Sequence, residues 1–256
     1  MKQTIAVIGI GNLGGVFSQA FLRLGHPVVP VLRGMDIAEV ADAVPNPALV
    51  LVAVGEEDLH PVLGELPGAW RDRVALLQNE LMPRDWEMFD LPQPTVAVVW
   101  FEKRQTMPAT PYYPNPVYGP RADLMLAALE ALDMPALELH DPGELLFELV
   151  RKNLYIVSKN IMGLVAEGTV GEVWDARRDP FERVAGDVLT IHEWLAGEPL
   201  PRQRLLEQLA HDIEALPDKG LAGSSAPARL RRMLMHASAA GLDVPALREI
   251  DAARRA

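Results

Sequence analysis

Short, continuous apolar runs alternate with segments of helical periodicity over the first half of the chain. Runs without polar alternation are typical of strands that are buried on both faces of a parallel sheet. The runs that predict strands are Thr4–Ile8, Val28–Leu32, Leu49–Val54, Val74–Leu77, Thr95–Trp100 and Ala136–His140. The segments that predict helices between them are Asn12–Leu24, Ile37–Val44, Asp58–Leu66 and Arg121–Leu132. Because strands that alternate with helices imply right-handed βαβ crossovers, we expect an α/β fold of the Rossmann type with a doubly wound parallel sheet.

The hydrophobic pattern changes beyond Asp141, where no further strand is predicted. Pro142 suits the first turn of a helix, and the periodicity continues to Glu167, which predicts one long helix. Shorter helical patterns follow at Pro180–Ala196, Pro201–Leu216, Pro227–Ala240 and Pro245–Ala253. We therefore expect an α/β domain over residues 1–140 and an all-helical domain over residues 141–256. Just before this boundary, Met107–Pro120 contains five prolines and predicts an irregular connection.

A glycine-rich turn links the first predicted strand to the first predicted helix. Gly9-Ile10-Gly11-Asn12-Leu13-Gly14 matches the pattern G-x-G-x-x-G. In such a turn the first glycine makes the bend, the second lets backbone amides approach a pyrophosphate, and the third allows close packing of helix on strand. The predicted helix begins at Asn12, followed by Leu13, and the positive end of its dipole favours binding of the anionic pyrophosphate. The pattern predicts dinucleotide binding, with a purely structural turn as the alternative.

The end of the second predicted strand indicates which dinucleotide is bound. NAD sites usually carry Asp or Glu there, to accept hydrogen bonds from the ribose hydroxyls. This chain has Arg33, and a guanidinium suits a 2′-phosphate. The residue therefore favours NADP(H), unless it is only a surface arginine that follows a strand.

Composition narrows the class of protein. The formal net charge is −11, which argues against a nucleic-acid partner, since such binding needs a basic face. The chain has no cysteine, so disulfides and zinc–thiolate sites are excluded, and its histidines show no metal-ligand spacing. No apolar run approaches the roughly 20 residues that span a bilayer, and the N-terminal segment lacks the features of a signal peptide. We expect a soluble, cytoplasmic protein that does not bind membranes.

The long predicted helix contains the stretch VRKNLYIVSKNIMG, Val150–Gly163. Two ammonium groups and a carboxamide, those of Lys152, Lys159 and Asn160, lie on a mostly apolar helix there. At about 100° per residue, Lys152 and Asn160 share a broad face. These residues form a catalytic centre, the remains of a site that no longer works, or the solvated edge of a core helix, where a lysine stem lies along apolar surface.

Taken together, these features resemble the ketopantoate reductase (2-dehydropantoate 2-reductase) family. The resemblance rests on IGIGNLGG, on Leu32-Arg33, on LLQN at Leu76–Asn79, and on the helix stretch with GTVGEVW behind it. It implies a Rossmann domain followed by an all-α domain like the C-terminal domain of 6-phosphogluconate dehydrogenase, which serves substrate binding and dimerisation. It also implies reduction of ketopantoate, or a related small 2-oxo acid, with NADPH, as in pantothenate biosynthesis, and a possible homodimer.

The resemblance assigns roles to individual residues. Lys152 matches the lysine that protonates the developing alkoxide, a role that Lys159 takes in an alternative assignment. Asn79 matches an asparagine at a strand end near the nicotinamide and substrate, and Asn160 matches a second helix asparagine. Asn79 is thus expected to serve both catalysis and cofactor binding.

Several polar residues of the family have no counterpart here. Ile156 stands one turn after Lys152, where members often have asparagine, and Val170 stands where another asparagine is common. The family's substrate-contacting glutamate falls on Ser225, next to Ser224. These serines are interpreted as helix caps or, with Arg229, as substrate-binding residues.

Three hypotheses follow. The first is an NADPH-dependent reductase of a small 2-oxo acid. The second is a divergent dehydrogenase whose pocket suits a less polar substrate, because aliphatic side chains in place of amides change what can be bound without an unsatisfied polar group. The third is a catalytically inactive NADP-binding or sensor protein, since a shared fold alone does not establish a reaction.

Overall fold

The computed structural model describes residues 2–103, 108–221 and 223–255. The chain divides into two compact units, Met1–Glu148 and Leu149–Ala256, and each is described here by itself. The division falls within the long helix α6, Pro142–Met162. The predicted long helix thus begins at the expected proline but ends earlier than Glu167.

The first unit is built on a seven-stranded sheet of order β2-β1-β3-β4-β5-β8-β9. The strands are β1 (Ile5–Ile8), β2 (Val28–Val31), β3 (Leu49–Val52), β4 (Val74–Leu76), β5 (Thr95–Ala97), β8 (Asn115–Tyr118) and β9 (Ala136–Leu139). The pairs from β2 through β5 are parallel, so the carboxyl ends of these strands meet at one edge of the sheet. This edge is where α/β proteins bind ligands.

The sheet has the expected doubly wound, mostly parallel arrangement, and one expectation about its strands was wrong. β8 runs antiparallel to β5, with β9 parallel to β8. β8 also lies inside the proline-rich stretch that was expected to be irregular, as does the short strand β7 (Thr110–Pro111), which pairs with β6 (Phe101–Glu102). Met107, which begins that stretch, lies outside the described residues.

Asn115 explains why a strand with a proline fits inside the sheet. Its side-chain Oδ1 accepts from the Trp100 N–H at 2.7 Å, and its Nδ2 donates to the Pro135 carbonyl at 2.8 Å. The Pro116 carbonyl still accepts from the Val98 N–H at 2.8 Å. The missing proline N–H therefore removes only one ladder donor, while a buried side chain adds two hydrogen bonds.

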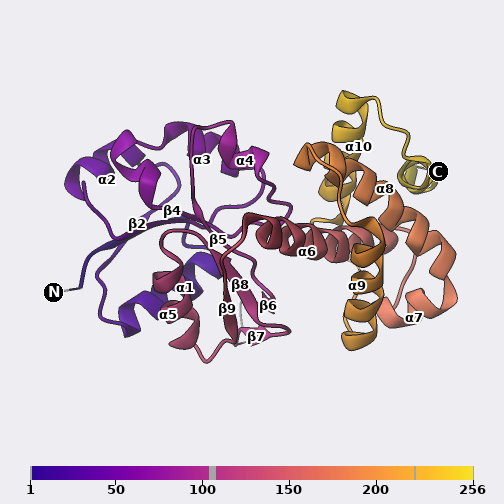
Figure 1. Ribbon diagram of the computed structural model, residues 1–256, viewed down its shortest axis with the longest axis horizontal. Coiled ribbons are helices and arrows are strands. Elements are labelled where there is room, and N and C mark those ends of the chain that lie inside the picture. The colour runs from indigo at the N-terminus through magenta and orange to yellow at the C-terminus, as the bar shows by residue number, and fades with distance from the viewer. Residues whose placement is uncertain (1, 104–107, 222, 256) are drawn as a thin grey trace. The chain divides into compact units, whose positions relative to one another are not determined.

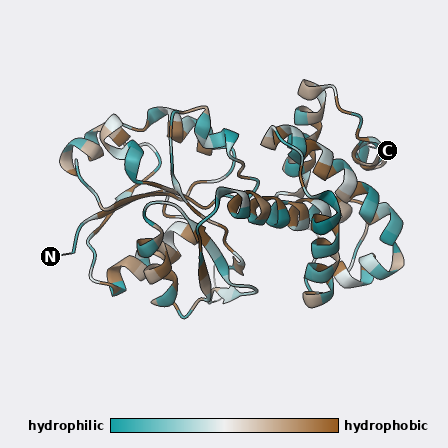
Figure 2. Ribbon diagram, viewed as in Figure 1, coloured by the Kyte–Doolittle hydropathy of each residue, from teal (hydrophilic) through white to brown (hydrophobic). Residues whose placement is uncertain are grey.

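Helices cover both faces of the sheet (Figure 1). The helices α1 (Asn12–Arg23) and α5 (Ala122–Glu130) lie on one face, and α2 (Ile37–Ala43), α3 (Leu59–Glu65) and α4 (Arg84–Glu87) lie on the other. A 3₁₀ helix, Gly68–Arg73, precedes β4. On the α1 side, fully buried Phe17 and Phe21 belong to one hydrophobic cluster with Ile5 and Val7 of β1. In Figure 2 the strands appear mostly brown, whereas the helices carry both teal and brown residues.

The second unit is helical. Its helices after α6 are α7 (Val170–Ala176), α8 (Arg178–Ala196), α9 (Arg202–Ala215), α10 (Ala226–Ala240) and α11 (Pro245–Arg255). The sequence pattern predicted all but α7, a short helix that begins with a capping box: Thr169 accepts from the Glu172 N–H, and the Glu172 carboxylate accepts from the Thr169 N–H. The capping box lies within the GTVGEVW stretch, so the start of α7 explains why Thr169 and Glu172 stand there.

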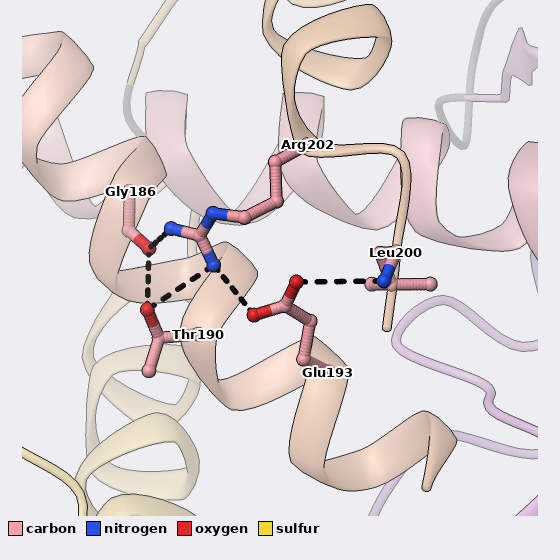
Figure 3. Close-up of polar contacts among 5 residues, drawn as sticks. All are labelled: Gly186, Thr190, Glu193, Leu200 and Arg202. Atoms are coloured by element: carbon pink, nitrogen blue, oxygen red, sulfur yellow. Dashed lines mark hydrogen bonds and ion pairs between the residues drawn. The ribbon is translucent and has the colours of Figure 1, made fainter. Parts of the chain in front are cut away.

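A network of polar contacts fixes the connection between α8 and α9 (Figure 3). Arg202 at the start of α9 donates to the Glu193 carboxylate at 2.7 Å, to the Thr190 hydroxyl at 3.3 Å and to the Gly186 carbonyl at 3.0 Å. The other carboxylate oxygen of Glu193 accepts from the Leu200 N–H at 3.4 Å. Three consecutive turns of α8 thus hold one guanidinium, which sets where α9 begins. No helix in the described part of the chain is long and apolar enough to cross a membrane.

Candidate functional site

Two of the three fingerprint glycines are required by the fold itself. Gly9 has a φ of 90°, and a β-carbon there would lie 2.9 Å from the Ala53 carbonyl oxygen. A β-carbon on Gly14 would lie 1.9 Å from the Gly9 carbonyl oxygen. Any side chain at Gly14 would therefore push α1 away from the end of β1, as the close-packing role of the third glycine implies.

Gly11 differs from both of these glycines. Its φ is −81°, which any residue adopts, and apart from its two chain neighbours no described residue has an atom within 4 Å of a β-carbon built on it. The fold therefore does not require glycine at this position. Gly11 is the N-cap residue of α1, so the first-turn N–H groups of Asn12 and Leu13 begin the helix beside it.

A cavity of about 620 Å³ opens against this turn. Its walls are the turn after β1, the ends of β2 and β3, and the adjoining parts of α2 and α3. The lining residues are Ile8, Gly9, Ile10, Gly11, Val31, Leu32, Arg33, Gly34, Met35, Ile37, Ala53, Val54, Gly55, Asp58, Pro61, Val62 and Glu65. Apolar walls with a few polar groups are typical of small-molecule and cofactor sites. Gly9, Gly11 and Arg33 line this cavity, whereas Asn12, Leu13, Gly14 and Asn79 do not.

Arg33 lines this cavity and pairs with Asp58. Its Nη2 is 3.0 Å from Asp58 Oδ2, and the two side chains are 91% and 54% exposed. Asp58 holds the N-cap position of α3, but its carboxylate makes no capping hydrogen bond to that helix. The carboxylate is thus directed to the guanidinium of Arg33.

Asn79 follows β4 at the carboxyl edge of the sheet. Its Nδ2 donates to Glu56 Oε1 at 3.2 Å, which joins the loops after β3 and β4. The preceding residue, Gln78, is buried and donates to the Val52 carbonyl at 2.7 Å, while its own Oε1 accepts from the Leu77 N–H at 3.1 Å. Gln78 therefore positions the two strand ends, and the expected role of Asn79 stays a prediction.

The candidate residues on α6 are mostly buried. Lys152 is 6% exposed and Asn160 is 3% exposed, whereas Ile156 is half-buried. Lys159, the alternative acid, donates from Nζ to the Gly220 carbonyl at 3.0 Å and lies 5.6 Å from the centre of the Tyr155 ring. Lys159 thus has a structural task that joins α6 to the segment before α10.

Asn160 joins the same two parts of the unit from a buried position. Its Nδ2 donates to the Leu221 carbonyl at 2.8 Å, and its Oδ1 accepts from Nη1 of the buried Arg229 on α10. Both ends of the carboxamide are therefore used within the protein. The arrangement fits the support role given to Asn160 better than direct contact with a substrate.

Ser224 and Ser225 lie at the start of α10. Ser225 occupies the N-cap position, as the capping interpretation requires, but its hydroxyl makes no capping hydrogen bond. Ser224 is exposed and Ser225 half-buried. Neither serine lines the cavity beside the turn after β1. Their substrate-binding role stays a prediction.

Three residues at or beside the cavity were not predicted to be functional from the sequence. Asp58 and Glu65 line the cavity, and Gln78 aligns the strand ends beside it. A usable signal existed for Asp58, because it stands between the buried parallel strand β3 and the helix α3, on the side of the sheet where α/β proteins bind ligands. Gln78 lies in the LLQN stretch on which the family resemblance partly rests, but the sequence did not indicate its hydrogen-bond partners.

Comparison with known proteins adds information at the level of structure. No protein-family model matches the chain, and no curated protein sequence does. The 2-dehydropantoate 2-reductase from Methylococcus capsulatus is similar with a TM-score of 0.69 at 15% identity, over 98% of this chain and 96% of that one. The ketopantoate reductase from Staphylococcus aureus, described as dimeric, has a TM-score of 0.63 at 16% identity, over 98% and 97%.

A second kind of enzyme is similar to the same extent. D-mandelate dehydrogenase, in a ternary structure with NADH and anilino(oxo)acetate, has a TM-score of 0.67 at 12% identity, over 98% of each chain. Likeness at such identities concerns the fold and leaves the reaction open. The resemblance inferred from the sequence is confirmed at this level: over nearly its whole length, the chain has the fold of the ketopantoate reductases.

Proposed function

We propose that this chain is a divergent member of the ketopantoate reductase family that reduces a small 2-oxo acid with a nicotinamide dinucleotide. The observation that carries the proposal is Gly11. The fold does not require glycine there, yet the residue lines a cavity at the start of α1, where a pyrophosphate approaches the backbone of such turns. A ligand that needs this open space explains the glycine, and a purely structural turn does not.

NADP(H) is the proposed cofactor. Arg33 lies at the end of β2 on the cavity wall, and a guanidinium can bind a phosphate through two parallel hydrogen bonds. Its side chain is exposed and its ion pair with Asp58 is between solvent-exposed groups, so it can change partner at low cost. The residue is thus available to a 2′-phosphate.

The proposed chemistry uses Lys152 as the proton donor. A bound reduced nicotinamide supplies the hydride for the carbonyl carbon of the substrate. The ammonium of Lys152 then gives a proton to the alkoxide oxygen, and its positive charge stabilises the negative charge that develops there. Asn160 supports the same helix through its bonds to Leu221 and Arg229. The dimeric state of the Staphylococcus aureus enzyme supports a homodimer as the working form.

A less polar 2-oxo acid is the second candidate substrate. Ile156 lies one turn beyond Lys152, and its side chain neither donates nor accepts a hydrogen bond. Similarity to D-mandelate dehydrogenase supports this alternative, because mandelate carries a phenyl ring beside its hydroxy acid group. An aliphatic residue beside such a ring avoids the unsatisfied polar group that an amide would leave.

The test is NADPH oxidation with a panel of 2-oxo acids that includes ketopantoate and the phenyl-substituted acid corresponding to mandelate. We expect turnover of at least one acid, and a loss of about 10²- to 10⁴-fold in Lys152→Met, the range for a general acid. Lys159→Met is the matched control, since it removes an ammonium from the same helix. Turnover that survives Lys152→Met would rule out its role. Nucleotide binding without turnover of any acid would favour a non-catalytic sensor.

A further inference from the structure

The charged residues that line the cavity carry a net negative charge, which is opposite to what a phosphate needs. Among the described lining residues the only cation is Arg33, while Asp58 and Glu65 are both carboxylates. Arg33 Nη2 lies 3.0 Å from Asp58 Oδ2, so the single guanidinium already has an anion beside it. A site built solely for a 2′-phosphate would not place a carboxylate at this point.

Asp58 has no structural task that explains the contact. It is the N-cap residue of α3, where an aspartate usually accepts from the backbone N–H groups of the next turn, but its side chain makes no such bond. The carboxylate instead accepts from Arg33, which follows β2. Its partner is therefore the residue that would bind the phosphate.

We infer that Asp58 is a specificity-determining residue that lowers the preference of this site for NADPH over NADH. The inference rests on the proposed dinucleotide site and concerns its selectivity. A 2′-phosphate must displace the Asp58 carboxylate from Arg33 and then lie beside that negative charge. The 2′-hydroxyl of NADH carries no charge and can donate to a carboxylate, so NADH loses nothing by its presence.

The size of the effect follows from the exposure of the pair. Ion pairs between solvent-exposed side chains contribute little, so the competition changes affinity by roughly two- to fivefold and does not abolish binding. The effect decreases as salt rises, since exposed charges are screened. Asp58 thus adjusts the ratio of the two affinities, and the site accepts both nucleotides.

The experiment is fluorescence titration of the full chain with NADPH and, separately, NADH. We expect Asp58→Asn to strengthen NADPH binding roughly two- to fivefold and to leave NADH binding unchanged or slightly weaker. The asparagine should leave α3 intact, because the aspartate does not cap it. Glu57→Gln is the matched control: it removes one negative charge from the neighbouring residue, which does not line the cavity, and should leave the ratio of affinities as it is.

Arg33→Ala distinguishes the mechanism. Because Asp58 acts partly by holding Arg33, the gain in NADPH affinity from Asp58→Asn should become smaller once Arg33 is absent, and a gain of unchanged size would overturn the inference. An equal ratio of affinities in wild type and Asp58→Asn would also overturn it, while the proposed function would stand because both nucleotides bind. Failure of the wild type to bind either nucleotide would overturn both.

Discussion

Arg33 in the α/β unit and Arg229 in the helical unit are both arginines with a polar partner, but their surroundings differ. The Arg33 side chain is 91% exposed and pairs with the exposed Asp58, whereas Arg229 is buried and donates to the buried Asn160. An exposed ion pair contributes little and can be exchanged for a ligand, while loss of a buried partner costs the full desolvation of the group left behind. The first arginine is therefore suited to recognition and the second to architecture.

The same contrast holds for other polar groups of the helical unit. Arg151 donates from two nitrogens to the fully buried Asp212 at 2.8 and 2.9 Å, and Gln208 donates to the same carboxylate at 3.0 Å. These groups satisfy one another inside the unit. In the α/β unit, by contrast, the turn at Gly11 leaves open space beside a helix N-terminus.

The largest expected effect comes from breaking the buried pair. Arg151→Met should lower the free energy of unfolding by roughly 3 kcal/mol, the lower end of the range for a buried ion left without its partner, because Gln208 still donates to Asp212. Chemical denaturation followed by circular dichroism measures this. The double variant Arg151→Met with Asp212→Leu should recover most of the loss, since it leaves no buried charge. A change below about 1 kcal/mol in the single variant would contradict the architectural role.

A smaller loss is expected at Asn160. Asn160→Ala removes the acceptor for Arg229 and the donor for the Leu221 carbonyl, which should cost roughly 2 kcal/mol of unfolding free energy in the absence of any ligand. The matched control is Lys159→Ala, whose partly exposed bond to the Gly220 carbonyl should matter less. If Asn160→Ala unfolds as the wild type does yet loses activity, Asn160 contacts the substrate and the structural interpretation is wrong.

The smallest effect concerns pH. Burial raises the pKa of the Asp187 carboxyl above its ordinary value of 3.8, with a smaller contribution from Asp243, although backbone N–H groups of Leu247 and Ala246 and the charge of Arg183 act in the opposite direction. The folded state thus holds this proton more tightly than the unfolded chain. The resulting stabilisation is complete below pH 3.8 and is lost as pH rises through the folded pKa.

Asp187→Asn should remove this dependence, because an asparagine oxygen can still accept from the Leu247 N–H. Above the folded pKa we expect the variant to be as stable as the wild type or more stable by roughly 0.5 kcal/mol, since the group is only partly buried. Urea denaturation at a series of pH values from about 3 upwards measures the difference between the two proteins. A difference that does not change with pH would contradict the shift.

Most of the fold could be predicted because its signals are local. Apolar runs marked six of the seven strands of the main sheet, and the glycines at Gly9 and Gly14 reflect a φ angle and a close contact within a few residues. β8 was missed because Pro116 and the prolines around the strand argue against it, and the side chain of Asn115 that completes its pairing acts through tertiary contacts.

The contacts of the candidate site residues could not be predicted in the same way. Arg33 and Asp58 are 25 residues apart in sequence, and Asn160 and Arg229 are 69 apart. Periodicity and spacing describe which face a residue lies on and do not name its partner across the fold. The sequence therefore predicted a phosphate-binding role for Arg33 and gave no sign of the carboxylate of Asp58 that lies beside it.

Gly11→Ala tests the central claim, that the turn after β1 binds a nicotinamide dinucleotide, most directly. Apart from its two chain neighbours, no described residue has an atom within 4 Å of a β-carbon there, so the free energy of unfolding should change by less than about 1 kcal/mol, the cost of alanine at an N-cap. NADPH titration should show a loss of affinity of roughly tenfold or more, because the methyl group fills space that the pyrophosphate needs. Gly15→Ala is the matched control: its β-carbon is equally free, it does not line the cavity, and it should bind as the wild type does. A folded Gly11→Ala variant that binds NADPH as tightly as the wild type would contradict the account.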